Sequence, residues 1–379
     1  MPDTSRRGLV KPTPAELMED TGSGLDYGTR PDRLFGDIVS ADRFFVRSHA
    51  DTPVIDASAW SLRIQGDGAR QPVSLSYEDL RTAFPLTSIV RTIECAGNRR
   101  VQFGREVGQA FEGTQWGRTA IGTAEWTGVR LRDVLESAGI TADACEVVPE
   151  SLDAIRARRP LPLAKALADD TIVAWAMNGE ELPPDHGFPA RLVVSGWLGA
   201  ASIKWLGRID VATHHVEVPW NTIDYVMIGP GYPAEGDQAR GPAITEPALS
   251  SLVELPWPAH LCSGPQIIRG RAFAGEARVT AVDYQIDDHD WQSATITSSG
   301  EPGVWARWQF RWDARPGEHV LRVRASDDRG RVQPDSTPGT NWATCTNRFS
   351  PIPSQLPPIP DDVPPRSDPA PTSDRVRAT

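Results

Sequence analysis

The sequence predicts an α+β domain with a large loop fraction, followed by a β-sandwich of immunoglobulin-like type. Helical and strand-like segments mix between residues 35 and about 240, whereas short strand-like runs separated by turn residues fill 241–350. A chain of 379 residues is too long for one small core. We therefore expect two folded domains, 35–240 and 241–350, between an extended arm over 1–34 and a disordered Pro-rich tail over 351–379.

The first domain contains both kinds of periodicity. Short alternating or β-branched runs that fit strands lie at 61–64, 87–93, 171–175 and 191–195. Ser76 is followed three residues later by Asp79, a pair that fits the start of a capped helix. Apolar residues at helical spacing over 131–135 predict another helix, which stops at Gly139.

The second domain follows a Gly- and Pro-rich connection over 229–258. Five short runs fit strands, at 267–270, 279–286, 291–296, 305–312 and 319–325. Regularly spaced short strands with turns between them are typical of a sandwich. The tail holds nine prolines in 29 residues and cannot bury a core, so we expect it to be disordered.

Charge and hydropathy exclude several classes of protein. Hydrophobic residues make up 39% and charged residues 23%, as in globular domains, and no stretch approaches the roughly 20 apolar residues of a membrane helix. A net charge of −11 argues against a nucleic-acid partner. Seven arginines stand against four glutamates between residues 91 and 132. This local excess fits either an anionic ligand or a set of solvated surface charges.

The four cysteines, Cys95, Cys145, Cys262 and Cys345, are far apart and have no zinc-type spacing, so a reduced compartment without disulfides is expected. The run SRRGLVK at 5–11 resembles a twin-arginine export signal but lacks the apolar region that such a signal needs. We therefore expect a cytoplasmic protein.

Cys95 stands at the end of a β-branched run and is followed at once by Gly-Asn turn chemistry, Arg99 and Arg100. Positive charges at this position favour a thiolate over a thiol. A thiolate here can bind a soft metal or attack an electrophile. A buried, unreactive cysteine is the alternative.

Five segments resemble one protein family and occur in that family's order. They are FFVRSH at 44–49, IECAGNRR at 93–100, WTGVRL at 126–131, DHGFPAR at 185–191 and IKWLG at 203–207. They are similar to the sulfite oxidase family, whose members hold a molybdopterin cofactor with one cysteine on the metal. The resemblance implies a mixed α/β molybdopterin-binding domain, then a domain that mediates homodimerisation, with one molybdenum–molybdopterin per chain.

The resemblance also assigns catalytic roles residue by residue. Cys95 would be the molybdenum ligand, and Arg47 and Arg100 would be cations of the substrate pocket. Tyr225 falls where the family places a tyrosine that can donate a hydrogen bond to substrate. Trp116 resembles a tryptophan that lines the same pocket.

Further positions match those that hold the cofactor in the family. They are Phe45, Val46, Arg47, Ser48, His49, Asp153, His186, Arg191, Ser202, Ile203 and Lys204. Arg191 and Lys204 suit a phosphate, and Asp153 suits the amino groups of a pterin.

The implied activity is oxidation of sulfite to sulfate by oxygen-atom transfer, with electrons passed to a separate acceptor. No CxxCH motif for c-type haem is present, and we expect neither a haem domain nor a flavin. The family's further pocket arginine from the second domain has no counterpart at 341–345. Neither nucleic acid nor a membrane is an expected partner.

Other functions stay open. Relatives with the same cysteine loop reduce nitrate, although Tyr225 favours sulfite because the nitrate enzymes tend to lack that tyrosine. Another sulfur compound or small oxyanion is a third substrate class. Cys95 could instead be the nucleophile of a hydrolase with a histidine base. The sandwich and the Pro-rich tail could also belong to a non-enzymatic binding protein.

Overall fold

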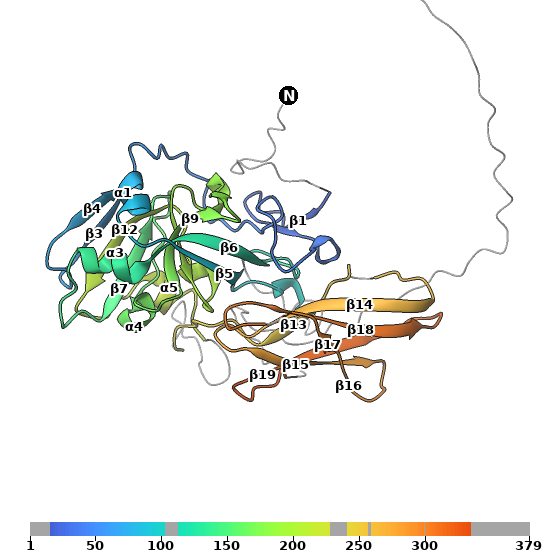
Figure 1. Cartoon of the computed structure of the whole chain (residues 1–379). Helices are drawn as coiled ribbons and strands as arrows, with labels where there is room; N and C mark the ends of the chain where they lie inside the picture. Colours follow the sequence, from blue (N-terminus) through green and yellow to red (C-terminus); the bar gives the residue numbers. More distant parts are fainter. Residues whose placement is uncertain (1–15, 103–112, 228–240, 257–258, 299, 335–379) are drawn as a thin grey trace, which may run out of the picture.

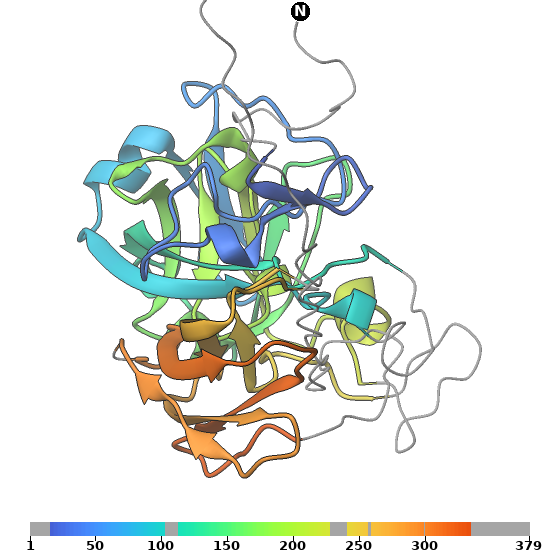
Figure 2. The same cartoon turned by 90° about the vertical axis from the view of Figure 1, so that its right-hand side faces the viewer.

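The computed structural model describes residues 16–102, 113–227, 241–256, 259–298 and 300–334. Figures 1 and 2 show the first domain, coloured blue to green, lying against the orange strands of the second. Hydrogen bonds join the two. The Thr92 N–H donates to the Gly303 carbonyl oxygen at 2.8 Å, and Lys165 pairs with Glu276 at 2.6 Å.

Two five-stranded sheets build the first domain. One is antiparallel throughout, with the order β10-β9-β6-β5 and β11 also paired to β9. Its strands are β5 (Thr87–Glu94), β6 (Ile121–Arg130), β9 (Thr171–Met177), β10 (Glu180–Glu181) and β11 (Arg191–Val194).

The other sheet has the order β4-β3-β12-β7-β8, and its β12–β3 pair is parallel. Its strands are β3 (Ser61–Gln65), β4 (Val73–Ser76), β7 (Glu146–Ser151), β8 (Leu161–Pro162) and β12 (Leu206–Ala212). All four predicted strands of this domain are confirmed within about two residues of their expected ends.

The predicted helices are also confirmed. In α1 (Tyr77–Thr82), the Ser76 hydroxyl accepts from the Asp79 N–H at 3.1 Å, and the Asp79 carboxylate accepts from the Ser76 N–H at 2.9 Å. This is the reciprocal capping expected from the spacing. The helix α3 (Leu131–Ser137) is followed by Gly139 at φ 69°. The described part of the domain also contains the short helices α4 (Leu163–Ala166) and α5 (Pro219–Thr222).

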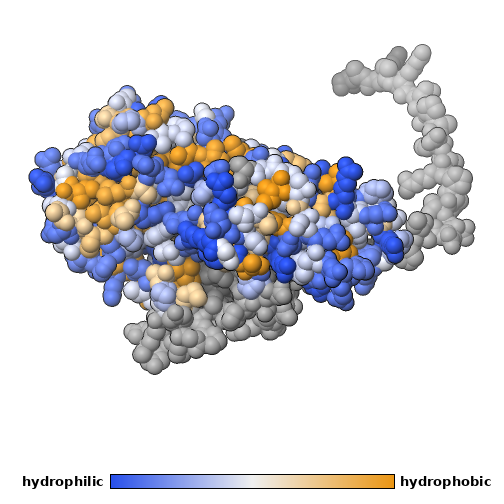
Figure 3. Space-filling view, turned by 60° about the horizontal axis from the view of Figure 1, so that its bottom comes forward, coloured by the Kyte–Doolittle hydropathy of each residue, from blue (hydrophilic) through white to orange (hydrophobic). Residues whose placement is uncertain are grey.

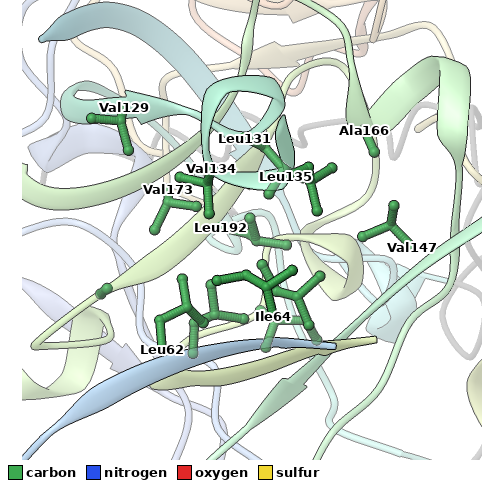
Figure 4. Close-up of a cluster of buried hydrophobic side chains, with 14 of the residues drawn as sticks. Leu62, Ile64, Val129, Leu131, Val134, Leu135, Val147, Ala166, Val173 and Leu192 are labelled. Atoms are coloured by element: carbon green, nitrogen blue, oxygen red, sulfur yellow. The ribbon is translucent and has the colours of Figure 1, made fainter. Parts of the chain in front are cut away.

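The core of the first domain combines side chains of both sheets with α3. Leu62 and Ile64 are fully buried, whereas Arg63 between them is exposed, so β3 alternates as its sequence predicts. Figure 4 shows these two side chains directed toward Val134, Leu135 and their neighbours.

The second domain is a β-sandwich, which confirms the predicted fold class. Its larger sheet contains β13 (Ser250–Val253), β14 (Gly264–Phe273), β17 (Thr295–Ile296) and β18 (Ala306–Ala314). Its smaller sheet contains β15 (Val279–Ile286), β16 (Gln292–Ser293) and β19 (Leu321–Asp327). The strand β13 lies inside the expected connection over 229–258, and the expected strand at 291–296 is two short ones. The tail over 351–379 lies outside the described residues.

The expected extended arm over 1–34 needs correction in its described part. Residues 16–34 contain β1 (Met18–Asp20), β2 (Tyr27–Thr29) and a 3-10 turn at Pro31–Arg33. Asp26 and Tyr27 are buried, and the Tyr27 and Val46 backbones pair in both directions. Composition suggested an arm because Gly, Pro and charged residues dominate here, yet these residues satisfy polar groups of the first domain.

The face of the molecule in Figure 3 has hydrophilic and hydrophobic areas interspersed, with a larger hydrophobic area at the left of the view. Within the described part of the chain, the helices are too short or too polar to span a bilayer.

Replacing Leu62 by Ala should lower the free energy of unfolding by about 2–5 kcal/mol, because the side chain is fully buried between the sheets. Arg63→Ala, on the exposed side of the same strand, should change it by less than about 0.5 kcal/mol. Urea unfolding followed by circular dichroism measures both. Equal effects of the two variants would contradict the described register of β3.

Candidate active site

The loop that carries Cys95 begins where β5 ends. The Cys95 N–H donates to the Ala120 carbonyl oxygen at 2.9 Å, and the Cys95 carbonyl accepts from the Asn98 N–H at 3.0 Å. The Gly97 N–H points at the sulfur, with 3.4 Å between N and Sγ. The turn therefore fixes the direction of the thiol by backbone contacts.

The buried carboxylate of Glu94 holds this loop in place through hydrogen bonds. One carboxylate oxygen accepts from the Asn98 side-chain amide and from the Arg99 guanidinium, each at 2.8 Å. The Asn98 side-chain oxygen in turn accepts from the Ala120 N–H at 3.1 Å. Arg99 adopts φ 73°, a left-handed conformation that is costly outside glycine. Arg99 is thereby committed to Glu94 and is a structural residue of the loop.

The pKa of the Cys95 thiol is raised, which corrects the expectation that the nearby arginines favour a thiolate. Burial raises this pKa most, and Arg47, the Gly97 N–H and Arg100 lower it by less. Bound metal stabilises a thiolate directly, so a role for Cys95 as a metal ligand does not require an acidic thiol in the metal-free protein.

Cys95 opens onto a cavity of about 740 Å³, counting the part open to solvent. Twelve predicted site residues lie on its wall: Phe45, Arg47, Ser48, His49, Cys95, Asp153, His186, Arg191, Ser202, Ile203, Lys204 and Tyr225. They come from segments far apart in the chain, which the two sheets bring together.

Asp26 positions Arg47 beside Cys95. One carboxylate oxygen of Asp26 accepts from the Arg47 guanidinium at 3.3 Å and from the Ser48 N–H at 3.0 Å, and the other accepts from the Thr114 hydroxyl at 2.8 Å. Burial lowers the pKa of Arg47, but Asp26 and Cys95 outweigh it and leave that pKa above its ordinary value. Sequence reasoning missed Asp26 because it lies in the supposed arm.

Two buried cations occupy another part of the cavity wall. The Lys204 ammonium donates to the Ser48 hydroxyl and the Asp185 carbonyl oxygen, both at 2.8 Å. Arg191 donates to three backbone carbonyl groups of its neighbours. Burial lowers the pKa of Lys204 to about 7 and that of Arg191 to about 9. Buried cations with mainly neutral partners make a site suited to an anion.

The two predicted histidines have different surroundings. The His186 Nε2 lies 2.9 Å from the Ala41 carbonyl oxygen, and its ring packs edge-on against Phe44. The His49 ring centroid lies 4.8 Å from that of Trp220, and His49 lines the cavity. Burial, with Arg47 and Lys204 in addition, lowers the pKa of His49 to about 3, so its imidazole is neutral.

Three predicted site residues are absent from the described cavity wall. Val46 is buried and pairs its backbone with Tyr27. Trp116 is fully buried and packs edge-on against Phe45 with 6.2 Å between ring centroids, so it supports the wall from behind. Arg100 donates to the Thr114 carbonyl oxygen at 2.9 Å and acts electrostatically on Cys95 and Tyr225 from a second layer.

Tyr225 follows α5 and also lines the cavity. Its ring packs edge-on against Trp220, with 5.4 Å between centroids. Burial raises the pKa of the phenol, and Cys95 raises it further, so Tyr225 keeps its proton and can donate a hydrogen bond. Sequence reasoning missed Trp220, since a tryptophan in a short turn carries no motif of its own.

The cavity residues fit a molybdopterin cofactor. The described residues contain no cluster of three or more His, Cys, Asp or Glu side chains able to hold a metal ion. A metal at Cys95 would need ligands besides these side chains, and an organic cofactor can supply them. The buried cations Arg191 and Lys204 would receive the phosphate of such a group, and Asp153, which accepts from the Ser151 hydroxyl at 2.6 Å, offers a carboxylate for pterin amino groups.

Comparisons with known proteins agree with this geometry. Residues 49–220 match the family model described as oxidoreductase molybdopterin binding domain. Sulfite oxidase from Gallus gallus is 36% identical over 77% of this chain and 67% of its own length. Nitrate reductase [NAD(P)H] from Hordeum vulgare is 31% identical over 79% of this chain, which spans 37% of that relative's length.

A solved structure of the sulfane dehydrogenase SoxCD from Paracoccus pantotrophus superposes with a TM-score of 0.74 at 30% identity, covering 88% of this chain and 86% of that chain. The fold and the cavity define a molybdopterin-binding oxidoreductase. Within that class, the chain belongs to the sulfite oxidase family.

Lys204 should make the stability of the cofactor-free protein depend on pH. Its pKa is about 7 when folded and 10.5 in its ordinary state, so between these values the unfolded chain binds more protons. The free energy of unfolding therefore rises with pH across this window. Lys204→Met should remove that contribution, which denaturant titrations of both proteins from pH 7 to pH 10 would measure. Parallel pH profiles would contradict burial of a charged Lys204.

Proposed function

We propose that this molybdenum oxidoreductase oxidises sulfite to sulfate and passes the electrons to a separate acceptor. The observation that supports this most is the arrangement of Arg47 and Tyr225 around Cys95 in one cavity. A dianion at this place would find a paired but accessible guanidinium and a protonated phenol. The relatives named sulfite oxidase support the same substrate.

Each side chain then has a definite task. Cys95 would bind the metal, and Arg191 with Lys204 would hold the cofactor's phosphate. The cofactor, when bound, supplies the two-electron oxygen-atom transfer chemistry. Arg47, with Arg100 behind it, would neutralise the charge of sulfite, and the Tyr225 hydroxyl would orient one of its oxygens. Sulfite and water together yield sulfate, two protons and two electrons.

Sulfite has two competitors as the substrate, both suggested by the comparisons. A nitrate reductase is among the relatives, and the superposed structure is a sulfane dehydrogenase. Nitrate carries a single negative charge, so it would use the cations around Cys95 less fully than a dianion does. A screen of the holoenzyme separates them: sulfite with ferricyanide should turn over much faster than nitrate with a reduced viologen. The reverse order would overturn the proposal.

Four further properties are proposed from the sequence alone. They are the lack of haem and flavin, a cytoplasmic location, a separate electron acceptor and a homodimer formed through the second domain. Sedimentation of the purified holoenzyme tests the dimer, and its visible spectrum tests haem and flavin.

Cys95→Ser should abolish turnover, by at least about 100-fold, because a hydroxyl is a poor replacement for a soft thiolate ligand. The fold should persist, since the loop is held by Glu94 and backbone contacts. Steady-state assays with elemental analysis for molybdenum check this. Cys145→Ser, at a cysteine outside the cavity, is the matched control and should keep activity.

Arg100→Gln should raise the KM for sulfite about tenfold, with a smaller change in kcat, because one positive charge behind the site is lost. Arg132→Gln is the control, since Arg132 pairs with Asp169 on the surface at 2.8 Å. An unchanged KM in Arg100→Gln would contradict its role in anion binding.

A further inference from the structure

Arg159 is a buried cation next to Tyr225 to which the resemblance assigns no role. Only 3% of its surface is exposed. Among the described residues it forms no ion pair with a carboxylate, and its Nη1 atom is buried without a hydrogen-bond partner. Burying a charge in this way is costly, so an arginine here is expected to serve a purpose besides stability.

Arg159 contacts Tyr225 in two ways, directly at the ring and indirectly through the backbone of Ile244. Its guanidinium carbon lies 5.6 Å from the centroid of the Tyr225 ring. Its Nη2 donates to the Ile244 carbonyl oxygen at 2.7 Å, and the Ile244 N–H donates to the Tyr225 carbonyl oxygen at 2.7 Å. Arg159 therefore holds both the ring and, through Ile244, the backbone of Tyr225.

Ile244 and Tyr225 also pack against the loop that carries Cys95. Ala96, the residue after Cys95, packs with Leu198 and Ile244, and Tyr225 packs against this group. The Leu198 N–H also donates to the carbonyl oxygen of Thr245, next to Ile244. A shift of Ile244 would thus move Tyr225 relative to the sulfur.

The surroundings of Arg159 differ from those of the two neighbouring arginines. Arg156 and Arg158 both pair with Glu150, and Arg158 also lies 3.9 Å from an oxygen of Asp210. Both are more exposed and serve to neutralise acids. Arg159 instead turns inward, and its burial lowers its pKa to about 10, so it still carries a full charge near pH 7.

We infer that Arg159 is a positioning residue for anion binding, which fixes the Tyr225 phenol in the cavity. This rests on the proposed function in that the anion is taken to be sulfite or its product sulfate. The guanidinium acts on the anion through its contact with the Tyr225 ring and through the Ile244 backbone.

The test uses the holoenzyme with Arg159→Met, Arg159→Lys and the control Arg158→Met. Two quantities are measured: the steady-state KM and kcat for sulfite, and the equilibrium Kd for sulfate from quenching of tryptophan fluorescence. Arg159→Met should raise both KM and Kd about tenfold with a smaller effect on kcat. Arg159→Lys should recover most of the affinity because it keeps the charge, and Arg158→Met should match the unaltered enzyme within about twofold.

Combination with Tyr225→Phe tests the proposed route. If Arg159 acts through Tyr225, the double variant should bind sulfate no more weakly than the weaker of the two single variants. Fully additive losses, an unchanged Kd in Arg159→Met, an equal loss in Arg158→Met or no saturable sulfate binding by the unaltered enzyme would each overturn the inference. A merely structural role would lower the melting temperature and leave KM and Kd alone.

The two proposals fail separately in this design. If sulfite is not turned over but sulfate affinity falls in Arg159→Met, the proposed function fails and the role of Arg159 stands. If sulfite is turned over and sulfate affinity is the same in all variants, the role of Arg159 fails alone.

Discussion

The paired hydrogen bonds from Asn98 and Arg99 to the buried carboxylate of Glu94 determine where the sulfur of Cys95 lies. They fix the turn at the end of β5, and the turn fixes the thiol against the Gly97 N–H. Burial raises the pKa of Glu94 above its ordinary value, whereas Arg99 and Asn98 lower it by less. Loss of one partner would leave an uncompensated polar group beneath the loop.

The charge distribution follows from this arrangement. The cavity wall gathers Arg47, Arg191 and Lys204 against Asp153 and Asp185, and further arginines stand behind it. Most of these cations donate hydrogen bonds to backbone carbonyls or hydroxyls. These groups are neutral, so the positive charge of the cations is available to an anion. An acidic chain thus contains an interior site with a small excess of positive charge. Anionic cofactors and substrates relieve the cost of that burial, so ligand binding and stability are coupled here.

Much of this could be predicted from the sequence, since the strongest signals are local. Alternation identified β3, the Ser76–Asp79 spacing identified the start of α1, and short motifs placed most of the cavity wall. The different hydrogen-bond partners of Arg99 and Arg100 could not be predicted from the sequence. Arg99 and Arg100 are chemically identical, yet a left-handed backbone directs Arg99 to Glu94 while Arg100 binds the Thr114 carbonyl.

Long-range packing explains the other differences. Asp26 reaches Arg47 from a segment whose composition suggested a loose arm, and Arg159 reaches Tyr225 across the fold. The protonation of Cys95 was misjudged because charge counts are visible in a sequence and burial is not. Desolvation outweighs two nearby arginines at this thiol.

The proposed site depends on one bond, between the sulfur of Cys95 and molybdenum. X-ray absorption at the molybdenum edge counts the sulfur atoms bound to the metal in the holoenzyme and in Cys95→Ser loaded with the same cofactor. We predict that the substituted protein has one sulfur fewer. An identical sulfur count in the two proteins would contradict the account.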